Sequence, residues 1–382
     1  MFRSVVRKFV SILALASFLS GCSDQPADVG MGLLTAQDTL HLETRVFGAT
    51  SAANFLTRIN GNSGRVLVGT FQDLEANALI EYTGIPKFIS GSTLDSATIT
   101  LTVDYRFRDT TGEFGISAHN MIRPWGTASF RWDSIPGSYD NALAGAYLKS
   151  ISASDTMSTL TFRIDTALVR TWSQTGTGSL LLMPSLTAQI ILGFSTVSNT
   201  LSDSRPLLTI NTRDSAGTPD TLRIRAPRSI FVANSTIPAA AQRTFIQAGV
   251  DYPVLLRFDS LALPPKVSVV EASLEFAIDE GTSLLNRYSR DSLIAYLTRK
   301  DVYPYDSLIL GAVCSPERIG LQKYYKANVR NIVQQWITHE PNHGLAIHSY
   351  AEFTTLDRFA VYGADAPPNL RPKLTVSYTL FP

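Results

Sequence analysis

Cysteine is almost absent from this sequence, and so is any excess of charge. The 382 residues include two cysteines, which excludes a disulfide-rich scaffold and a cysteine-rich zinc domain. Lysine and arginine number 33 against 32 acidic residues, so no polycationic surface for nucleic acid is expected. Hydrophobic residues make up 45% of the chain, which excludes a disordered polymer. A chain of this length is typical of two domains.

The N-terminus has the pattern of an export signal. It begins with three basic side chains, Arg3, Arg7 and Lys8, and carries no acidic residue before the first cysteine. The uncharged apolar stretch at 9–20 is far shorter than the roughly 20 residues that span a bilayer as a helix. A basic start and a short apolar core indicate a signal peptide, here residues 1–21.

The segment Leu19-Ser-Gly-Cys22 resembles the lipobox of bacterial lipoproteins. The resemblance implies cleavage before Cys22 and a diacylglycerol on its thiol; the alternative is an ordinary secretory signal with an incidental cysteine. Lipid alone would then attach the protein to the membrane, because two or more acyl chains anchor stably. Residues 22–37 are expected to form a tether. In enterobacterial sorting rules, an aspartate directly after the lipidated cysteine retains a lipoprotein in the inner membrane. Ser23 stands at that position here, which favours the outer membrane of the cell envelope.

Beyond residue 37, short apolar strands alternate with polar turns. The segment 98–103 alternates strictly, and 273–278 does the same, which is the period of a half-buried β-strand. A helix is predicted near 329–337, where apolar residues follow the i, i+3, i+4 spacing and Pro341 ends the pattern.

Several of these motifs occur twice, at a separation that drifts between 164 and 182 residues. Ala97 aligns with Ala272. The helical motif Val-x-x-Trp that ends at Trp172 aligns with the one that ends at Trp336. The strand that follows an Arg-Pro pair and ends at Ile210 aligns with the one that ends at Val376. We interpret this as a tandem duplication with domains at 38–213 and 214–382, joined by a small polar linker at 214–219. The predicted fold is all-β: two tandem antiparallel β-sandwich domains of jelly-roll-like type, each with one short helix.

The order of motifs in the first copy resembles the DNRLRE domain, a β-sandwich module of secreted and surface bacterial proteins. The motifs are Trp125 and Trp132 seven residues apart, Val-x-x-Trp172, Gly178 before an apolar strand, and Arg205-Pro before the last strand. Thr127 stands where that family has an acidic residue, and the second copy lacks the tryptophan pair. Some such modules resemble carbohydrate-binding modules for acidic polysaccharides, so the resemblance implies binding or structure, not chemistry. The start of the mature chain also resembles an uncharacterised lipoprotein family.

Glycan binding would use exposed aromatic side chains that stack on sugar rings. The candidates are Trp125, Trp132, Tyr105, Tyr303 and Tyr305, with Arg106 and Arg108 for an acidic sugar. The competing interpretation is that the two tryptophans pack inside the sandwich and the arginines line a solvated strand face.

No catalytic residue, cofactor or metal site is predicted. His339-Glu-Pro-Asn-His343 matches the zinc-protease pattern, but Pro341 cannot lie inside the helix which that chemistry needs. A loose surface metal site that also uses His348 is the remaining alternative. The leading hypothesis is a membrane-anchored, non-catalytic lipoprotein that binds glycan or another envelope component. Its alternatives are a structural or adhesion protein with protein partners, and a polysaccharide-degrading enzyme.

Overall fold

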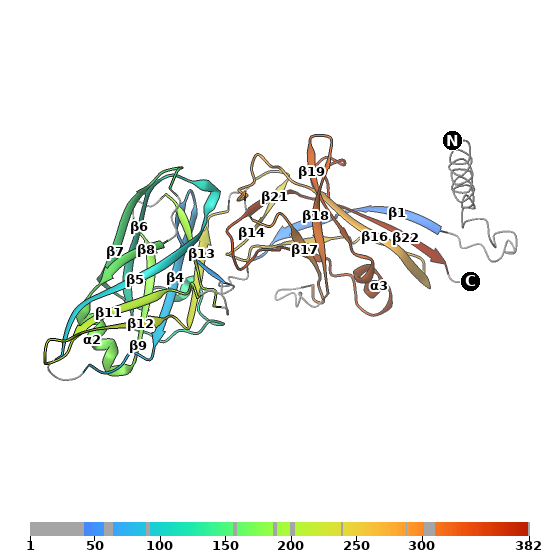
Figure 1. The fold of residues 1–382 in the computed structure, drawn as a ribbon. Helices are drawn as coiled ribbons and strands as arrows, with labels where there is room; N and C mark the ends of the chain where they lie inside the picture. Colours follow the sequence, from blue (N-terminus) through green and yellow to red (C-terminus); the bar gives the residue numbers. More distant parts are fainter. Residues whose placement is uncertain are drawn as a thin grey trace, which may run out of the picture.

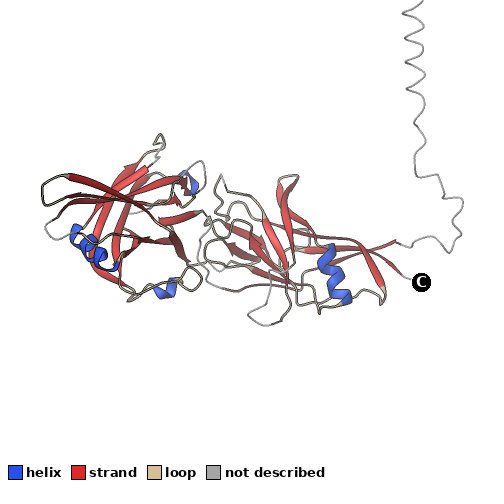
Figure 2. Ribbon diagram, turned by 60° about the horizontal axis from the view of Figure 1, so that its bottom comes forward, coloured by secondary structure: helices blue, strands red, loops and turns tan. Residues whose placement is uncertain are grey.

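The residues that the structure describes form two β-rich units with one α-helix each. The computed structural model describes residues 42–56, 64–88, 92–155, 159–185, 189–198, 203–237, 240–287, 289–301 and 310–380. The helices in these ranges are α2 (Thr166–Thr175) and α3 (Arg330–Thr338), beside two short 3-10 turns. Figure 2 shows strands throughout both units. The predicted all-β class is confirmed. Neither described helix is long and apolar enough to cross a membrane.

The first unit is an antiparallel sheet of eleven described strands. They are β3 Arg65–Phe71, β4 Leu74–Thr83, β5 Thr93–Arg106, β6 Gly112–Met121, β7 Tyr139–Ile151, β8 Thr159–Ile164, β9 Thr177–Pro184, β10 Ile191–Ser195, β11 Leu207–Arg213, β12 Pro219–Arg225 and β13 Arg228–Ser235. Their order is β10-β3-β4-β9-β6-β7-β8-β5-β11-β12, with β13 beside β4. Strand β10 also pairs with β5, so the sheet closes on itself around one apolar core.

The second unit contains the remaining described strands. They are β1 Leu42–Gly48, β2 Ser51–Asn54, β14 Arg243–Gln247, β15 Val254–Arg257, β16 Val267–Ala277, β17 Leu293–Leu297, β18 Gly311–Ile319, β19 Gln322–Asn328, β20 Leu345–Ser349, β21 Arg358–Tyr362 and β22 Lys373–Leu380. Nine form a sheet in the order β1-β22-β16-β19-β18-β17-β20-β15-β2. Strands β14 and β21 form a separate pair that covers this unit's own core.

The two predicted copies exchange their first two strands. Strands β1 and β2 begin the first copy in sequence, yet they pair with β22 and β15 of the second unit. Strands β12 and β13 begin the second copy, yet they pair with β11 and β4 of the first unit. In Figure 1, β1 is blue and lies along β22 among the orange and red strands. The sheets therefore do not follow the predicted boundaries of 38–213 and 214–382.

The segment 214–219, predicted as the linker between domains, is a hairpin turn inside the first unit. The side chain of Asp214 accepts hydrogen bonds from the backbone N–H groups of Ala216 and Thr218, at 2.9 and 2.8 Å. This is the local geometry for which aspartate is favoured in turns. The same polar, small residues that suggested a linker thus connect β11 to β12.

Strand pairing agrees with the internal repeat. Ala97 lies opposite Ile210 in the β5–β11 pair, and Ala272 lies opposite Val376 in the β16–β22 pair. These are the residues that the sequence comparison aligned. The pairing of β4 with β9 likewise recurs as β15 with β20. The two units are therefore built to the same strand plan, each completed by strands from the other copy.

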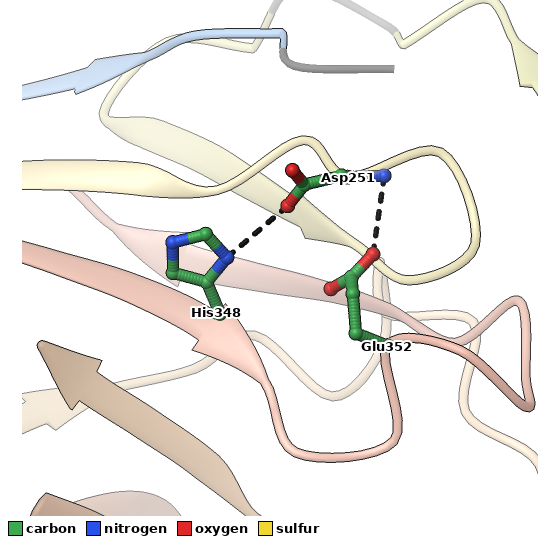
Figure 3. Close-up of side chains that lie close together, drawn as sticks. All are labelled: Asp251, His348 and Glu352. Atoms are coloured by element: carbon green, nitrogen blue, oxygen red, sulfur yellow. Dashed lines mark hydrogen bonds and ion pairs between the residues drawn. The ribbon is translucent and has the colours of Figure 1, made fainter. Parts of the chain in front are cut away.

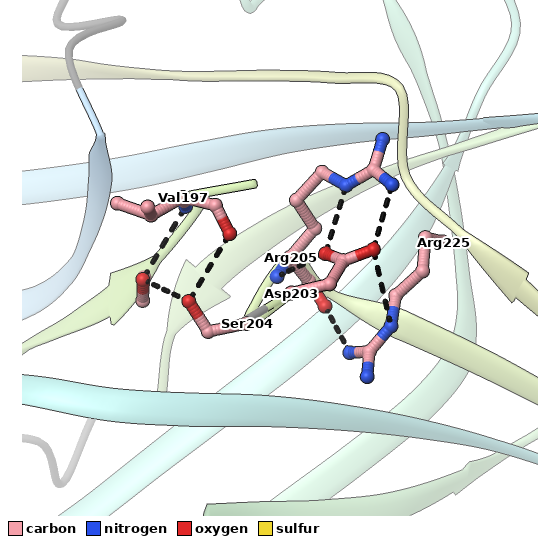
Figure 4. A network of polar contacts seen from close by, with 6 residues as sticks. Val197, Asp203, Ser204, Arg205 and Arg225 are labelled. Carbon is pink, nitrogen blue, oxygen red and sulfur yellow. Dashed lines mark hydrogen bonds and ion pairs between the residues drawn. The ribbon is translucent and has the colours of Figure 1, made fainter. Parts of the chain in front are cut away.

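The Arg-Pro motif before β11 holds the segment that leads into that strand in place through side-chain hydrogen bonds. Arg205 donates two hydrogen bonds to the carboxylate of Asp203, at 2.9 and 2.7 Å. Arg225 of β12 donates to the carbonyl oxygen of Arg205 at 2.6 Å (Figure 4). The hydrogen bonds from Arg205 lower the pKa of Asp203 to about 2. The motif is thus structural, because it joins the end of one copy to the first strand of the next.

Tryptophan positions in the first unit serve packing. Trp125 is 6% exposed, and its indole N–H donates to the Ser179 hydroxyl at 2.7 Å. It packs with Leu79, Leu181 and Ile230 in a small cluster on the outer side of β4, β9 and β13, and half-buried Trp132 contacts that cluster. Gly178 is required near the helix, because a Cβ there would lie 2.1 Å from the ring of Trp172.

The strand exchange predicts which fragments fold. A fragment of residues 64–237 contains every strand of the first unit, whereas 38–213 lacks β12 and β13 and carries β1 and β2 without partners. We expect 64–237 to unfold cooperatively on heating and 38–213 to be poorly folded or aggregated, because unpaired strand edges associate. Circular dichroism melts and size-exclusion chromatography measure this. A more cooperative melt for 38–213 than for 64–237 would contradict the exchange.

Candidate functional site

The two units are joined by an ion pair between buried Arg358 and half-buried Asp73. The guanidinium of Arg358, on β21 of the second unit, donates to the Asp73 carboxylate of the first unit at 2.6 and 3.2 Å. It also donates to Ser235 of the first unit and to the side-chain oxygen of Gln247, each at 2.7 Å. Because the Arg358 side chain is buried, removing Asp73 would leave its charge without its carboxylate partner, so this contact stabilises the junction of the two units.

Two further contacts close the junction. The Asn286 side chain of the second unit accepts from the backbone N–H of Arg108 at 3.2 Å and donates to the carbonyl oxygen of Arg106 at 3.4 Å. Val250 and Leu356, from two loops of the second unit, are buried in the apolar core of the first. The end of β5 is therefore held against the second unit by polar and apolar contacts together.

An open pocket lies at this junction, and we call it the junction pocket. Its volume is about 390 Å³. The first unit contributes Arg65, Asp104 and Tyr105, and the second contributes Arg290, Tyr350 and Phe353 among others. The residues Tyr350 and Phe353 are 38% and 44% exposed. Apolar rings beside polar groups in a concave site are typical of a ligand-binding pocket.

The two arginines of the junction pocket differ in their partners. Arg65 forms a two-point ion pair with Asp104, at 2.7 and 3.1 Å, and its guanidinium lies 4.7 Å from the ring centre of Tyr105. The guanidinium of Arg290 lies 3.6 Å from the ring centre of Tyr350 and forms no ion pair with a described residue. Arg290 is therefore the cation that can meet an anionic ligand, since stacking leaves its N–H groups available.

The loop that carries Tyr350 and Phe353 also carries a buried carboxylate. Asp251, His348 and Glu352 come from the turn before β15, from β20 and from the loop after it, and they are 6%, 7% and 6% exposed. His348 Nδ1 lies 3.1 Å from Asp251 Oδ1, and the Asp251 backbone N–H donates to Glu352 Oε1 at 3.1 Å (Figure 3). We call these three residues the Asp–His–Glu cluster.

The sequence-predicted site residues are dispersed rather than gathered. Tyr105 is buried and lines the junction pocket, and burial raises its pKa. Half-buried Arg106 donates to the carbonyl oxygen of Ser152 at 3.1 Å, and exposed Arg108 does not line the pocket. Trp125 and Trp132 lie in the packing cluster described above, so Trp125 offers no open ring face. Tyr303, Tyr305, Cys22, the signal peptide and the tether lie outside the described residues.

The zinc-protease pattern is a loop, as predicted. Helix α3 ends at Thr338, so His339 and His343 do not share a helix. His348 is not part of a surface group with them; it belongs to the buried Asp–His–Glu cluster. The sequence analysis did not single out Asp251 and Glu352, because neither shares a motif with His348. The sequence around the pocket residues Tyr350, Phe353 and Arg290 also contains no motif that would indicate a binding site.

Comparison with known proteins gives no family. No family model matches the chain, and no curated protein matches it. Among solved structures, the C-terminal domain of the AgI/II polypeptide BspA of Streptococcus agalactiae aligns with 10% identity, covering 90% of this chain and 92% of that chain at a TM-score of 0.18. A structure of the Macrobrachium rosenbergii nodavirus aligns with 9% identity over 94% and 95%, at 0.15. These scores assign neither fold nor function, and the DNRLRE resemblance stays a prediction.

The junction contains a titrating group that makes stability depend on pH. Asp357 is 1% exposed, and burial raises its pKa to about 6 although the backbone N–H of Asn286 donates to it. An unfolded aspartate has a pKa of about 3.9. The folded protein therefore holds this proton at a higher pH than the unfolded chain does, and the contribution of Asp357 to stability falls as the pH rises from about 4 to about 6.

We expect Asp357→Asn to stabilise the protein at pH 8 by about 2–3 kcal/mol, since asparagine accepts the same hydrogen bond without ionising. The difference from wild type should vanish near pH 4. Urea unfolding at pH 4, 6 and 8 measures it. A difference that is independent of pH would show that Asp357 ionises as it does in the unfolded chain.

Proposed function

We propose that this protein is a lipid-anchored, non-catalytic component of the bacterial cell envelope that binds an acidic glycan in the junction pocket. The observation that carries the proposal is the combination of exposed rings with Arg290 in one open pocket. A sugar ring presents C–H groups that stack on an aromatic face, and a uronate carboxylate accepts charge-assisted hydrogen bonds from a guanidinium. Phe353 would supply the stacking face and Arg290 the charge.

The composition of the junction pocket favours binding over hydrolysis. Glycoside hydrolysis ordinarily uses two carboxyl groups that face one another across the sugar. The described lining of the pocket holds one carboxylate, Asp104, and Arg65 engages both of its oxygens. Tyr105 has a raised pKa, which opposes its use as a base. A polysaccharide-degrading activity is therefore the weaker candidate.

A structural or adhesion role with protein partners is the second candidate. One observation favours it: the hairpin of β18 and β19 presents Leu321 at its tip with 97% exposure, beside Ile319 at 54%. Exposed apolar side chains at a hairpin tip offer a contact for another protein. The two candidates use different surfaces, so variants at each can separate them.

Binding of an acidic polysaccharide tests the pocket. We expect the soluble protein from residue 23 onward to bind a polyuronate in isothermal titration calorimetry and not to bind a neutral glucan. The affinity for the polyuronate should fall as the salt concentration rises. Arg290→Ala and Phe353→Ala should each weaken binding by about tenfold or more, which corresponds to about 1.4 kcal/mol. Arg108→Ala, a charge-matched control outside the pocket, should bind as wild type does. Equal binding by all variants would exclude this pocket as the site.

Lipid anchoring is tested separately. We expect the full-length protein to fractionate with membranes and to incorporate a labelled fatty acid, and Cys22→Ser to lose the label because a hydroxyl does not replace the thiol. Cys314→Ser serves as the control, since that thiol is buried and burial raises its pKa to about 12. A Cys22→Ser protein that stays labelled would contradict the lipobox interpretation.

A further inference from the structure

The Asp–His–Glu cluster has the donor set of a metal site. It offers one imidazole nitrogen and two carboxylates, and the candidate ligand atoms all lie within 4.8 Å of one another. Imidazole and carboxylate together are ligands of Zn²⁺, which binds each at about 2.0–2.2 Å. Ligands at that distance around a tetrahedral ion are separated by about 3.4 Å, so small side-chain shifts bring all three onto one ion.

The charges of the cluster favour a cation. Burial, and then the negative charge of Asp251, raise the pKa of Glu352 well above its ordinary value. No lysine or arginine of the described residues forms an ion pair with Glu352; its Oε1 is instead held by the backbone N–H of Asp251. The charge of a carboxylate buried beside another carboxylate, as Glu352 is, is unfavourable unless a proton or a cation compensates it.

The imidazole of His348 is held by two aromatic rings and by one hydrogen bond, the contact of its Nδ1 with Asp251. Rings of Phe55 and Tyr296 lie edge to face with the His348 imidazole, at 6.3 and 5.6 Å between centres. Its Nδ1 points toward Asp251, while Nε2 is buried without a hydrogen-bond partner. Nothing described therefore competes for the ring proton at Nε2, which is where the proton resides when Nδ1 binds a metal.

Backbone hydrogen bonds around the cluster already hold the turn at 248–251 against the loop at 350–357. The N–H groups of Ala248 and Gly249 donate to the carbonyl oxygens of Asp357 and Glu352, both at 2.9 Å. Gly249 has a φ of +74°, and a Cβ there would lie 2.4 Å from the Leu356 side chain, so the close approach requires glycine. The ligands are thus presented from a rigid frame, which reduces the ordering that metal binding would otherwise require.

We propose that Asp251, His348 and Glu352 bind one divalent transition-metal ion, with Zn²⁺ as the fitting case, which fastens the 350–357 loop to the turn at 248–251. Because Tyr350 and Phe353 lie on the same loop, the ion would also hold two walls of the junction pocket. Metal binding itself does not depend on the proposed glycan function.

Zinc titration of the soluble protein tests the site without any glycan. The untagged protein is freed of metal by a chelator, titrated with ZnCl₂ in a calorimeter, washed and analysed by mass spectrometry for bound zinc. We expect one zinc per chain and a melting temperature about 5 °C or more above that of the metal-free protein, because a ligand that binds only the folded state stabilises it. Less than about 0.1 zinc per chain in the wild type would overturn the proposal.

Variants identify the ligands and separate binding from folding. His348→Gln and Glu352→Gln should each lose the zinc and the thermal shift. Metal-free Glu352→Gln should melt no lower than the metal-free wild type, because the change removes a carboxylate from beside Asp251. A loss of zinc in this variant therefore cannot be attributed to misfolding. His343→Gln is the matched control and should keep one zinc. Zinc that persists in His348→Gln but disappears in His343→Gln would place the ion on the surface and overturn the assignment.

Discussion

The pairing of exchanged strands is the constraint on which the rest of this structure depends. Each unit obtains two edge strands from the other copy, so the backbone hydrogen bonds of β1, β2, β12 and β13 join parts of the sequence that a simple tandem array would keep apart. The chain must cross between the units twice, once after β2 and once after β13. Two crossings and the buried Arg358 contact leave little freedom between the units.

That fixed junction is what allows one pocket to be built from two units. Arg65 and Tyr105 come from the first unit, and Arg290 and Phe353 from the second, yet they line the same cavity. A single loop, 350–357, contributes to the pocket, to the Asp–His–Glu cluster and to the apolar core of the first unit through Leu356. The lining of the pocket and the packing of the units therefore share this loop, and the proposed ligand recognition would depend on it as well.

Much of the fold could be predicted from the sequence, but little of the site. The alternation at 98–103 and 273–278 identified strands, and the equivalence of Ala97 with Ala272 anticipated their register. The exchange could not be predicted, because alternation shows that a strand has a buried face and not which sheet it joins. Asp251 lies 97 residues from His348 in sequence, so only the folded loops bring them together. Short-range spacing pointed instead to His343, which lies in a loop.

The position of β1 also determines how the molecule would carry force. Leu42 at the start of β1 lies opposite Thr379 near the end of β22, at the end of the second unit that is remote from the first (Figure 1). A pull through the residues before Leu42, resisted at the first unit, acts along β1 rather than across it. The seven residue pairs of β1 and β22 would then be sheared together instead of being peeled apart one by one. The weakly buried first strand thus becomes a mechanical clamp, because its hydrogen bonds would have to fail collectively.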